Sequence, residues 1–266
     1  MGKINYVVLV LAFSTLIATP VLARNLQTGF LDRTVTVSGV TYRYQVFVPS
    51  NFDPHKKWPV ILFLHGAGER GDDGLLQTDV GLGRAIRKYN GEFPFVVVMP
   101  QCRKEKLWTQ AEMQAQALAT LDQSMKEFKG DKDRVYLTGL SMGGYGTWDL
   151  AGKNLGRFAA FVPICGGIHG PPHFPQLHVG LVDDPKVTDP YAETARRIGS
   201  TPVWIFHGGD DPLVPVEESR KMAQALEAAK ANFHYTEYPG VGHESWDKAY
   251  AEPALFPWFL EQKLKK

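Results

Sequence analysis

Alternating hydrophobic and polar residues predict a β-hairpin in the first part of the chain. In RTVTVSGVTYRYQVFVPSNF, residues 33–52, apolar and polar side chains alternate as they do in a strand with one buried face. Ser38 and Gly39 interrupt this alternation with a pair that suits a two-residue turn. The pattern therefore predicts two antiparallel strands.

Longer apolar runs follow, and they predict a different kind of strand. WPVILFLHG at 58–66 and FPFVVVMPQ at 93–101 are almost continuously apolar and end at Gly or Pro. Such runs are typical of strands in a parallel sheet that is covered on both faces. Strand character returns at 134–140, 157–167, 201–209 and 233–239.

Helical spacing separates some of these strands. Between Thr109 and Gly130, apolar residues recur every three or four positions; Thr109 and Glu112 suggest a capping box, and Gly130 is placed to end the helix. Further helices are expected at 216–231 and from about residue 253. Alternating strands and helices predict an α/β fold, with a mostly parallel twisted sheet of about eight strands, an N-terminal antiparallel hairpin and helices on both faces. In such sheets, catalytic and ligand-binding residues lie just beyond the carboxyl ends of the strands.

Composition limits the organisation and the partners of the chain. The 266 residues, 44% of them hydrophobic, suit one large domain, which we expect at 24–266. Lys and Arg number 29 against 28 Asp and Glu, so no charge excess favours nucleic acid or an anionic membrane. The sequence does not indicate an oligomeric state.

The first 23 residues are expected to form a signal peptide. Lys3 precedes an apolar run over residues 4–17, and Val21-Leu22-Ala23 offers small residues at the spacing that a signal peptidase recognises. An uncleaved membrane anchor is the alternative, because about 20 residues can span a bilayer. Pro20 and the cleavage site favour cleavage, which predicts a secreted or periplasmic protein without stable membrane insertion.

A serine between glycines ends one of the predicted strands, in DRVYLTGLSMGGYGTWDLAG at 133–152. Gly139, Ser141 and Gly143 fit Gly-x-Ser-x-Gly, in which a sharp strand-to-helix turn exposes the serine hydroxyl above the sheet. The glycines make room for a strained serine backbone and for a helix that starts close to the strand. A glycine-rich chain can contain this pentapeptide by chance, but the strand before it favours Ser141 as a nucleophile.

A serine nucleophile needs a histidine base oriented by a carboxylate. His243 lies in YPGVGHESW, a Gly-rich loop after the last predicted strand, where the base of an α/β-hydrolase is expected. A solvent-exposed loop histidine is the alternative. His65 and His207 precede Gly at strand ends and are interpreted as structural residues that shape a turn.

The carboxylate is either Asp210 or Asp211 in HGGDDPLVPV. Here the sequence resembles the α/β-hydrolase serine esterases, whose acid commonly stands in His-Gly-x-x-Asp-x-x-Val-Pro. Asp211 fits that spacing and Asp210 does not. The resemblance thus implies a triad of Ser141, His243 and Asp211.

The oxyanion of the tetrahedral intermediate needs donors that are fixed in advance. One is expected to be the backbone N–H of Met142, directly after the nucleophile. The other is expected in the loop HGAGERG, residues 65–71, where Ala67 is the favoured donor. The alternative is a tight turn that merely requires glycine, and the sequence is compatible with it.

The motifs LFLHGAGERG, VVVMPQC, RVYLTGLSMGGYGTWDLA, VPICGG, PVWIFHGGDDPLVPV and YPGVGHESW resemble secreted esterases of the polyhydroxybutyrate depolymerase and feruloyl esterase type. That group has dienelactone-hydrolase-like and prolyl-oligopeptidase-like relatives. The resemblance implies a serine carboxylic-ester hydrolase that forms an acyl-enzyme, requires no cofactor and acts on feruloyl or acetyl esters of plant cell-wall polysaccharide. Short aliphatic esters, polyesters and peptides remain alternative substrates, and a non-catalytic binding module is a further alternative.

Aromatic residues near the predicted site allow two interpretations. Trp108 and Trp246 each lie a few residues beyond a strand end and are candidates for an acyl pocket. Tyr145 and Trp148 follow Ser141 at helical spacing, which favours packing in the core.

The irregular stretch at 166–190 is expected to border the substrate cleft, and whether it forms a lid is left open. Its histidines, His169, His173 and His178, lie near three aspartates, but the Pro-rich setting does not favour a metal site. In the family resembled, Cys102 and Cys165 would follow strands three places apart, about 14 Å at the usual strand spacing. A disulfide needs Cα atoms within about 7 Å, so both cysteines are expected to be free thiols.

Overall fold

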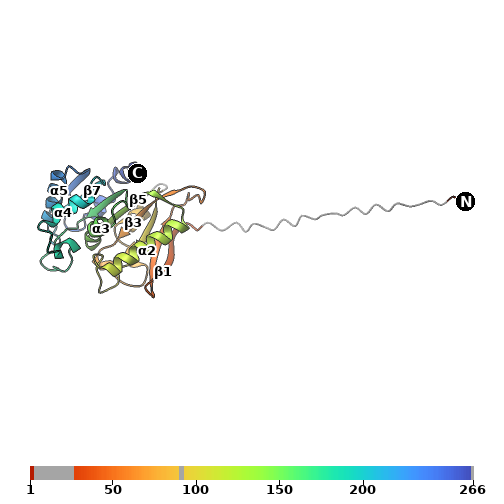
Figure 1. Cartoon of the computed structure of the whole chain (residues 1–266), viewed down its shortest axis with the longest axis horizontal. Coiled ribbons are helices and arrows are strands. Elements are labelled where there is room, and N and C mark those ends of the chain that lie inside the picture. The colour runs from red at the N-terminus through yellow and green to blue at the C-terminus, as the bar shows by residue number, and fades with distance from the viewer. Residues whose placement is uncertain (3–26, 90–92, 265–266) are drawn as a thin grey trace.

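The computed structural model describes residues 1–2, 27–89 and 93–264. Apart from its first two residues, the expected signal peptide lies outside this part of the chain. Within it, eight strands form one mixed sheet (Figure 1) in the order β1-β2-β4-β3-β5-β6-β7-β8. The strands are β1 (Gly29–Val37), β2 (Val40–Val48), β3 (Trp58–Leu64), β4 (Val96–Pro100), β5 (Gly130–Leu140), β6 (Ala160–Ile164), β7 (Val203–Gly208) and β8 (Phe233–Tyr238).

The N-terminal hairpin that alternation predicts is confirmed. β1 and β2 pair antiparallel, and Val37 lies opposite Val40 across the two-residue turn. Ser38 and Gly39 both have positive φ, 48° and 80°, as a turn that follows the twist of the strands requires. β2 also pairs antiparallel with β4, and from β4 to β8 every neighbouring pair is parallel. The predicted α/β-hydrolase fold is thereby confirmed.

Helices cover both faces of the sheet, because the side chains of each central strand point alternately to two hydrophobic cores. Val60, Leu62 and Leu64 of β3 enter one core, whereas Ile61 and Phe63 enter the other. The first core is closed by α2 (Ala111–Glu127), α3 (Met142–Lys153), α4 (Pro190–Ile198) and α5 (Glu217–Ala228), and the second by α1 (Leu82–Lys88), α6 (Trp246–Ala249) and α7 (Leu255–Glu261).

The start of α2 differs from the prediction. The helix begins at Ala111 after an N-cap at Gln110 that makes no side-chain capping bond, so Thr109 and Glu112 do not form a capping box. Glu112 instead pairs with Lys106 at 2.7 Å and accepts a hydrogen bond from the Tyr42 hydroxyl. The Glu112 carboxylate thus bonds to Lys106 and Tyr42 instead of to a backbone N–H at the start of the helix.

The end of α2 also differs from the prediction. Gly130 does not terminate the helix but opens β5, and Lys129 before it takes the left-handed conformation with φ of 53°. Beside Gly130 there is little space, since a Cβ there would lie 2.3 Å from the sulfur of Met125. Glycine at this position thus allows the Met125 side chain to pack closely against the start of β5, and its φ is not in the left-handed region.

Strand order brings three distant segments to one edge of the molecule. β5, β6, β7 and β8 are consecutive and parallel, so the loops that follow them emerge side by side. Those loops carry Ser141, Asp211 and His243. In the part of the chain that the structure describes, no helix combines the length and the apolar character that a membrane span requires.

Candidate active site

Ser141 stands at the turn between β5 and α3, in the conformation that the glycine pattern predicts. Its φ of 52° and ψ of −118° lie outside the usual regions for a residue with a side chain, which marks local strain. The turn is held by the Ser141 N–H, which donates to the Ile164 carbonyl at 2.9 Å, and by the Ser141 carbonyl, which accepts from Gly144 at 2.8 Å. A Cβ on Gly143 would lie 1.9 Å from the Leu64 carbonyl oxygen, so only glycine fits there.

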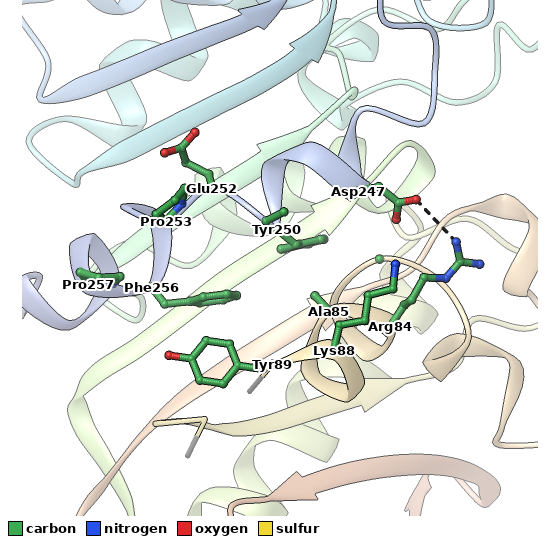
Figure 2. A pocket seen from close by; sticks show the side chains of 12 residues that line it. Arg84, Ala85, Lys88, Tyr89, Asp247, Tyr250, Glu252, Pro253, Phe256 and Pro257 are labelled. Carbon is green, nitrogen blue, oxygen red and sulfur yellow. Dashed lines mark ion pairs between the residues drawn. The ribbon is translucent and has the colours of Figure 1, made fainter. Parts of the chain in front are cut away.

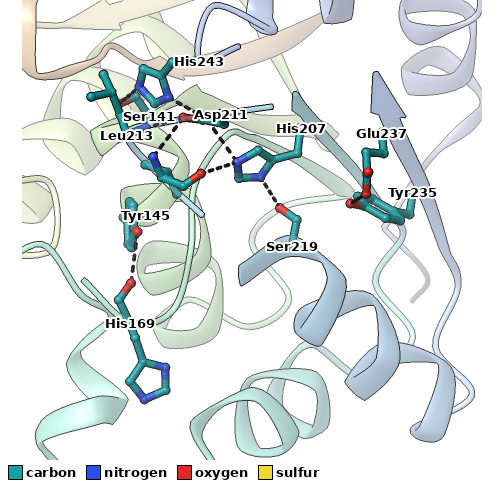
Figure 3. A network of polar contacts seen from close by, with 11 residues as sticks. Ser141, Tyr145, His169, His207, Asp211, Leu213, Ser219, Tyr235, Glu237 and His243 are labelled. Atoms are coloured by element: carbon teal, nitrogen blue, oxygen red, sulfur yellow. Dashed lines mark hydrogen bonds and ion pairs between the residues drawn. The ribbon is translucent and has the colours of Figure 1, made fainter. Parts of the chain in front are cut away.

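The side chains of Ser141, His243 and Asp211 lie in one hydrogen-bonded row (Figure 3). His243 Nε2 is 2.8 Å from Ser141 Oγ, and His243 Nδ1 is 2.7 Å from Asp211 Oδ2. Because the carboxylate can only accept, Nδ1 carries the proton and Nε2 is free to accept the serine proton. The three residues expected to form a triad are therefore within direct reach of one another.

The loops after β7 and β8 bring the acid and the base together. Gly209 N–H donates to the Tyr238 carbonyl at 2.9 Å, and Asp210 N–H donates to the Val241 carbonyl at 3.0 Å. These bonds continue the pairing of β7 and β8 beyond the strand ends, so Asp211 and His243 leave the sheet from adjacent positions. Of the two aspartates, Asp210 is exposed, and Asp211 faces the histidine.

Asp211 is a buried carboxylate with four donors around it. Burial alone would raise its pKa, but hydrogen bonds from His207, His243 and the Val214 N–H outweigh burial and hold that pKa well below its usual range. The Leu213 N–H also donates to it, at 2.8 Å. The acid is thus ionised at any pH where the enzyme would work, and it can stabilise an imidazolium.

The loop expected to complete the oxyanion hole follows β3. Met142 opens α3 and Ala67 opens the short helical turn Ala67–Glu69, so both N–H groups stand where a helix has no internal acceptor for them. Arg70 fixes the loop from behind, since its Nε donates to the Ala67 carbonyl at 3.0 Å. The loop is also tied to the end of β4, where Gln101 Nε2 donates to the Glu69 carbonyl at 3.1 Å. The role of these two amides as oxyanion donors stays a prediction.

The structure separates the two tryptophans expected in the acyl pocket. Trp108 is 1% exposed, and its indole N–H donates to the His65 carbonyl at 2.9 Å. It therefore supports the loop at 65–71 from the core and offers no wall to a substrate, which differs from the expectation. Trp246 packs edge-on against the His243 ring, with centroids 5.4 Å apart, and so lies beside the base. Tyr145 and Trp148 are fully buried, which confirms their expected place in the core.

Buried polar contacts tie down the irregular stretch after β6. Glu218 of α5 accepts hydrogen bonds from the N–H groups of Ile168 and His169 at 2.8 and 2.9 Å. The Tyr145 hydroxyl donates to the His169 carbonyl at 3.0 Å (Figure 3), and Tyr191 donates to Glu218 at 2.7 Å. The segment next to the triad is therefore anchored to α3, α4 and α5.

Among the described residues, one group of three donors could approach a metal ion, and it is Cys165, Asp211 and His243. Two of the three are engaged with each other in the triad, and Cys165 is a fully buried thiol whose pKa burial raises above its usual range. These donors fit the proton relay better than they fit a cation.

A cavity of about 290 Å³ lies between α1 and the α6–α7 segment, on the face opposite α3. Figure 2 shows Arg84, Tyr89 and Phe256 around it, with Arg84 paired to Asp247 at 3.5 Å. None of the triad residues lines this cavity, although α6 follows His243 closely in sequence. The cavity therefore lies outside the candidate active site.

His207 has a contact that the sequence reasoning missed. The sequence predicts a turn residue at this position, yet His207 Nε2 lies 3.2 Å from Asp211 Oδ2. The spacing allows this contact without requiring it, because a buried strand residue four positions before the acid can turn back onto it. Nothing in the sequence distinguished this arrangement from the one at His65, whose ring binds backbone groups: Nδ1–H donates to the Gly66 carbonyl and Nε2 accepts the Cys102 N–H.

Solved structures and characterised proteins resemble this chain over different lengths. The structure of a thermostable esterase superimposes with a TM-score of 0.73 and 33% identity, covering 88% of this chain and 63% of that one. The feruloyl esterase module from Clostridium thermocellum, complexed with sinapinate, has a TM-score of 0.63 and 18% identity over 88% of each chain, which shows a shared fold. Acyl-protein thioesterase 1 of Gibberella zeae is 34% identical over 42% of this chain and 42% of its own length.

The bifunctional acetylxylan esterase/xylanase XynS20E of Neocallimastix patriciarum is 31% identical over 46% of this chain and 17% of its own length. Less than two thirds of the thermostable esterase, the thioesterase and the bifunctional enzyme is thus matched. The family model described as dienelactone hydrolase family matches residues 99–252, a span that includes Ser141, Asp211 and His243. Since this span is more than half of the chain, the protein belongs to the dienelactone hydrolase family.

Proposed function

We propose that this protein is a serine carboxylic-ester hydrolase. The observation that carries the proposal is the row of hydrogen bonds from Ser141 Oγ through His243 to Asp211, at 2.8 and 2.7 Å. A hydroxyl with an imidazole base at this distance, itself oriented by a buried carboxylate, is the arrangement that activates serine for attack on an acyl carbon. Membership of the dienelactone hydrolase family supports hydrolysis as the class of reaction.

The reaction begins when Ser141 Oγ attacks the ester carbonyl and its proton passes to His243 Nε2. Asp211 stabilises the imidazolium through its bond to Nδ1. The N–H groups of Met142 and Ala67 receive the oxyanion of the tetrahedral intermediate. His243 then gives the proton to the leaving alcohol, which leaves an acyl group on Ser141, and a water activated by the same imidazole releases the acid.

For the substrate, we propose feruloyl or acetyl esters of plant cell-wall polysaccharide. Support comes from the names of two relatives, an acetylxylan esterase/xylanase and a feruloyl esterase module with bound sinapinate. The second relative shares only the fold at 18% identity, so the acyl group must be tested directly.

A substrate panel tests both levels of the proposal. Wild-type protein should hydrolyse nitrophenyl acetate, and it should prefer methyl ferulate or acetylated xylan over longer aliphatic esters and a polyester. Ser141→Ala should lower kcat by at least about 10⁴-fold with unchanged folding. Equal turnover by the two proteins would contradict the ester hydrolase, whereas a preference for the polyester would contradict only the cell-wall substrate.

A peptidase is the second candidate, because acylaminoacyl peptidases share the fold with a TM-score of 0.64 over 90% of this chain. This chain covers 42% of that peptidase, so more than half of the peptidase has no counterpart here. Faster release of an amine from a peptide amide than of an alcohol from the matching ester would favour this alternative.

We further propose that the protein is exported and that cleavage follows Ala23. The apolar run after Lys3 and the small residues at 21–23 support this proposal. N-terminal sequencing of the mature protein should begin at Arg24. Retention of Met1 would contradict it.

A further inference from the structure

Two histidines, His207 and His243, contact the same carboxylate oxygen of Asp211. His207 Nε2 lies 3.2 Å from Asp211 Oδ2, the atom that also accepts from His243 Nδ1 at 2.7 Å (Figure 3). The other carboxylate oxygen, Oδ1, accepts from Leu213 and Val214 N–H groups at 2.8 and 2.9 Å. The side chains of His207 and Asp211 are both fully buried. Solvent therefore does not reach either side chain in the folded protein.

The surroundings of His207 determine which of its nitrogens carries the proton. Nε2 faces two acceptors, Asp211 Oδ2 and, at 3.1 Å, the Val214 carbonyl, so it must be the donor. Nδ1 lies 2.7 Å from Ser219 Oγ in the first turn of α5. In the neutral ring Nδ1 has a lone pair, and it accepts the Ser219 hydroxyl proton. The Ser219 hydroxyl then donates to His207, and His207 in turn donates to the Asp211 carboxylate.

We propose that His207, with Ser219 behind it, is a positioning residue for the catalytic carboxylate, a role that rests on the proposed function. The Nε2–H of His207 fixes the rotation of Asp211 and draws negative charge from Oδ2. Less charge on Oδ2 weakens the attraction between the carboxylate and the cationic ring of His243, so His207 adjusts how strongly the imidazolium is held during the reaction.

The other ionisable groups around this row are neutral, paired or exposed. Burial raises the pKa values of Cys165 and Tyr145 above their usual range, so both are neutral. Glu237 lies opposite His207 in the β7–β8 pair, and hydrogen bonds from Arg220 and Tyr235 lower its pKa to about 2. Glu218, beside Ser219, is occupied by N–H groups after β6 and by Tyr191. The exposed acidic neighbours in the two loops are Asp210 and Glu244.

Substitution of His207 separates positioning from simple support of the turn. His207→Phe fills the space but removes the donor, and we expect kcat to fall at least about tenfold, as losses behind a ligand or triad group commonly do. We also expect the acid limb of the kcat/KM profile to move to higher pH, because without the His207 donor the carboxylate attracts the imidazolium more strongly. His207→Gln keeps an N–H at a similar reach and should restore both values most of the way.

Ser219→Ala tests the same row with a smaller change, should His207→Phe fold poorly. It removes the hydroxyl that polarises His207, so the acid limb should move in the same direction by a smaller amount. Ser124→Ala is the matched control, since Ser124 is also a fully buried helix serine with a side-chain partner, the Tyr44 hydroxyl at 3.4 Å, but lies on α2 away from the triad. This control should leave the acid limb in place.

The outcomes distinguish this inference from the proposed function. If the wild-type protein hydrolyses esters and Ser141→Ala does not, but His207→Phe and Ser219→Ala keep the wild-type acid limb, the positioning role is wrong and the esterase stands. If His207→Phe lowers kcat equally at every pH and His207→Gln does not restore it, His207 has only a structural role and the positioning role is likewise wrong. If the wild-type protein hydrolyses no ester, the proposed function fails first.

Discussion

At the scale of single residues, Asp211 keeps a full negative charge in a buried position. Four donors make this possible, two from the backbone and two from histidines. Their hydrogen bonds depress its pKa in the folded protein, whereas in the unfolded chain an aspartate titrates near 3.9. The stabilisation that the folded state gains is therefore complete above about pH 4 and is lost as the pH falls toward the depressed value.

Replacing this carboxylate should change how stability depends on acid. Between pH 5 and pH 3, we expect the free energy of unfolding to fall by about 1 kcal/mol more in wild-type protein than in Asp211→Asn. The reason is that Asp211 takes up a proton on unfolding in this range, whereas an asparagine at the same position cannot. Urea unfolding of both proteins at the two pH values measures this. An equal loss in both proteins would show that Asp211 titrates normally.

At the scale of elements, α3 starts so close to the sheet that its first turn admits no side chain at one position. Gly143 faces the Leu64 carbonyl, and a Cβ there would lie 1.9 Å from that oxygen. Near the end of the same helix, a Cβ on Gly152 would meet nothing within 4 Å. One helix thus offers a glycine that the fold requires and another that it does not.

The two alanine substitutions should therefore have opposite effects. Gly143→Ala forces α3 away from β3 and should lower the free energy of unfolding by about 3 kcal/mol, with loss of activity. Gly152→Ala should raise it by about 0.5–1 kcal/mol, since alanine restricts the unfolded chain and favours the helix. Thermal and urea unfolding measure both, and similar destabilisation by the two changes would contradict the close approach.

The loop at 65–71 is held from behind, and this support should matter for catalysis. Arg70→Ala removes the bond from Nε to the Ala67 carbonyl, and we expect kcat to fall about tenfold with little change in KM, because a loosened donor is lost mainly in the transition state. Arg157→Ala, which removes a surface pair with Asp122, is the control and should leave both constants unchanged. A rise in KM alone would instead assign Arg70 to substrate binding.

At the scale of the whole molecule, the strand order keeps the two cysteines apart. Cys102 follows β4 and Cys165 follows β6, and β3 and β5 lie between these strands. Both thiols are free and fully buried. The free thiols expected from the sequence are thus confirmed.

A thiol count should reflect this arrangement. Without reductant, a disulfide-exchange reagent should react slowly with the folded protein and should reveal two thiols per chain once the protein is unfolded. Burial explains the slow reaction, because it raises the pKa of Cys102 to about 12 and so suppresses the reactive thiolate. Zero thiols in denaturant would require a disulfide that this sheet order does not allow.

The sequence predicted the features that depend on periodicity and on strand ends. The hairpin, the parallel strands and the positions of Ser141, Asp211 and His243 follow from signals that are local or tied to a shared sheet edge. Features decided by tertiary partners were not predictable in this way. Glu112 bonds to Tyr42 on β2 instead of capping α2, and Trp108 points into the core. His207 contacts Asp211 in the loop after β7 and Ser219 on α5.

Active-site labelling tests the central claim most directly. An activated Ser141 should react with a fluorophosphonate probe, and peptide mapping by mass spectrometry should locate one adduct on that serine in the wild-type protein. Ser141→Ala should remain unlabelled, and His243→Ala should label far more slowly because the base is gone. Absence of labelling in wild-type protein, or an adduct on another serine, would contradict the proposed nucleophile.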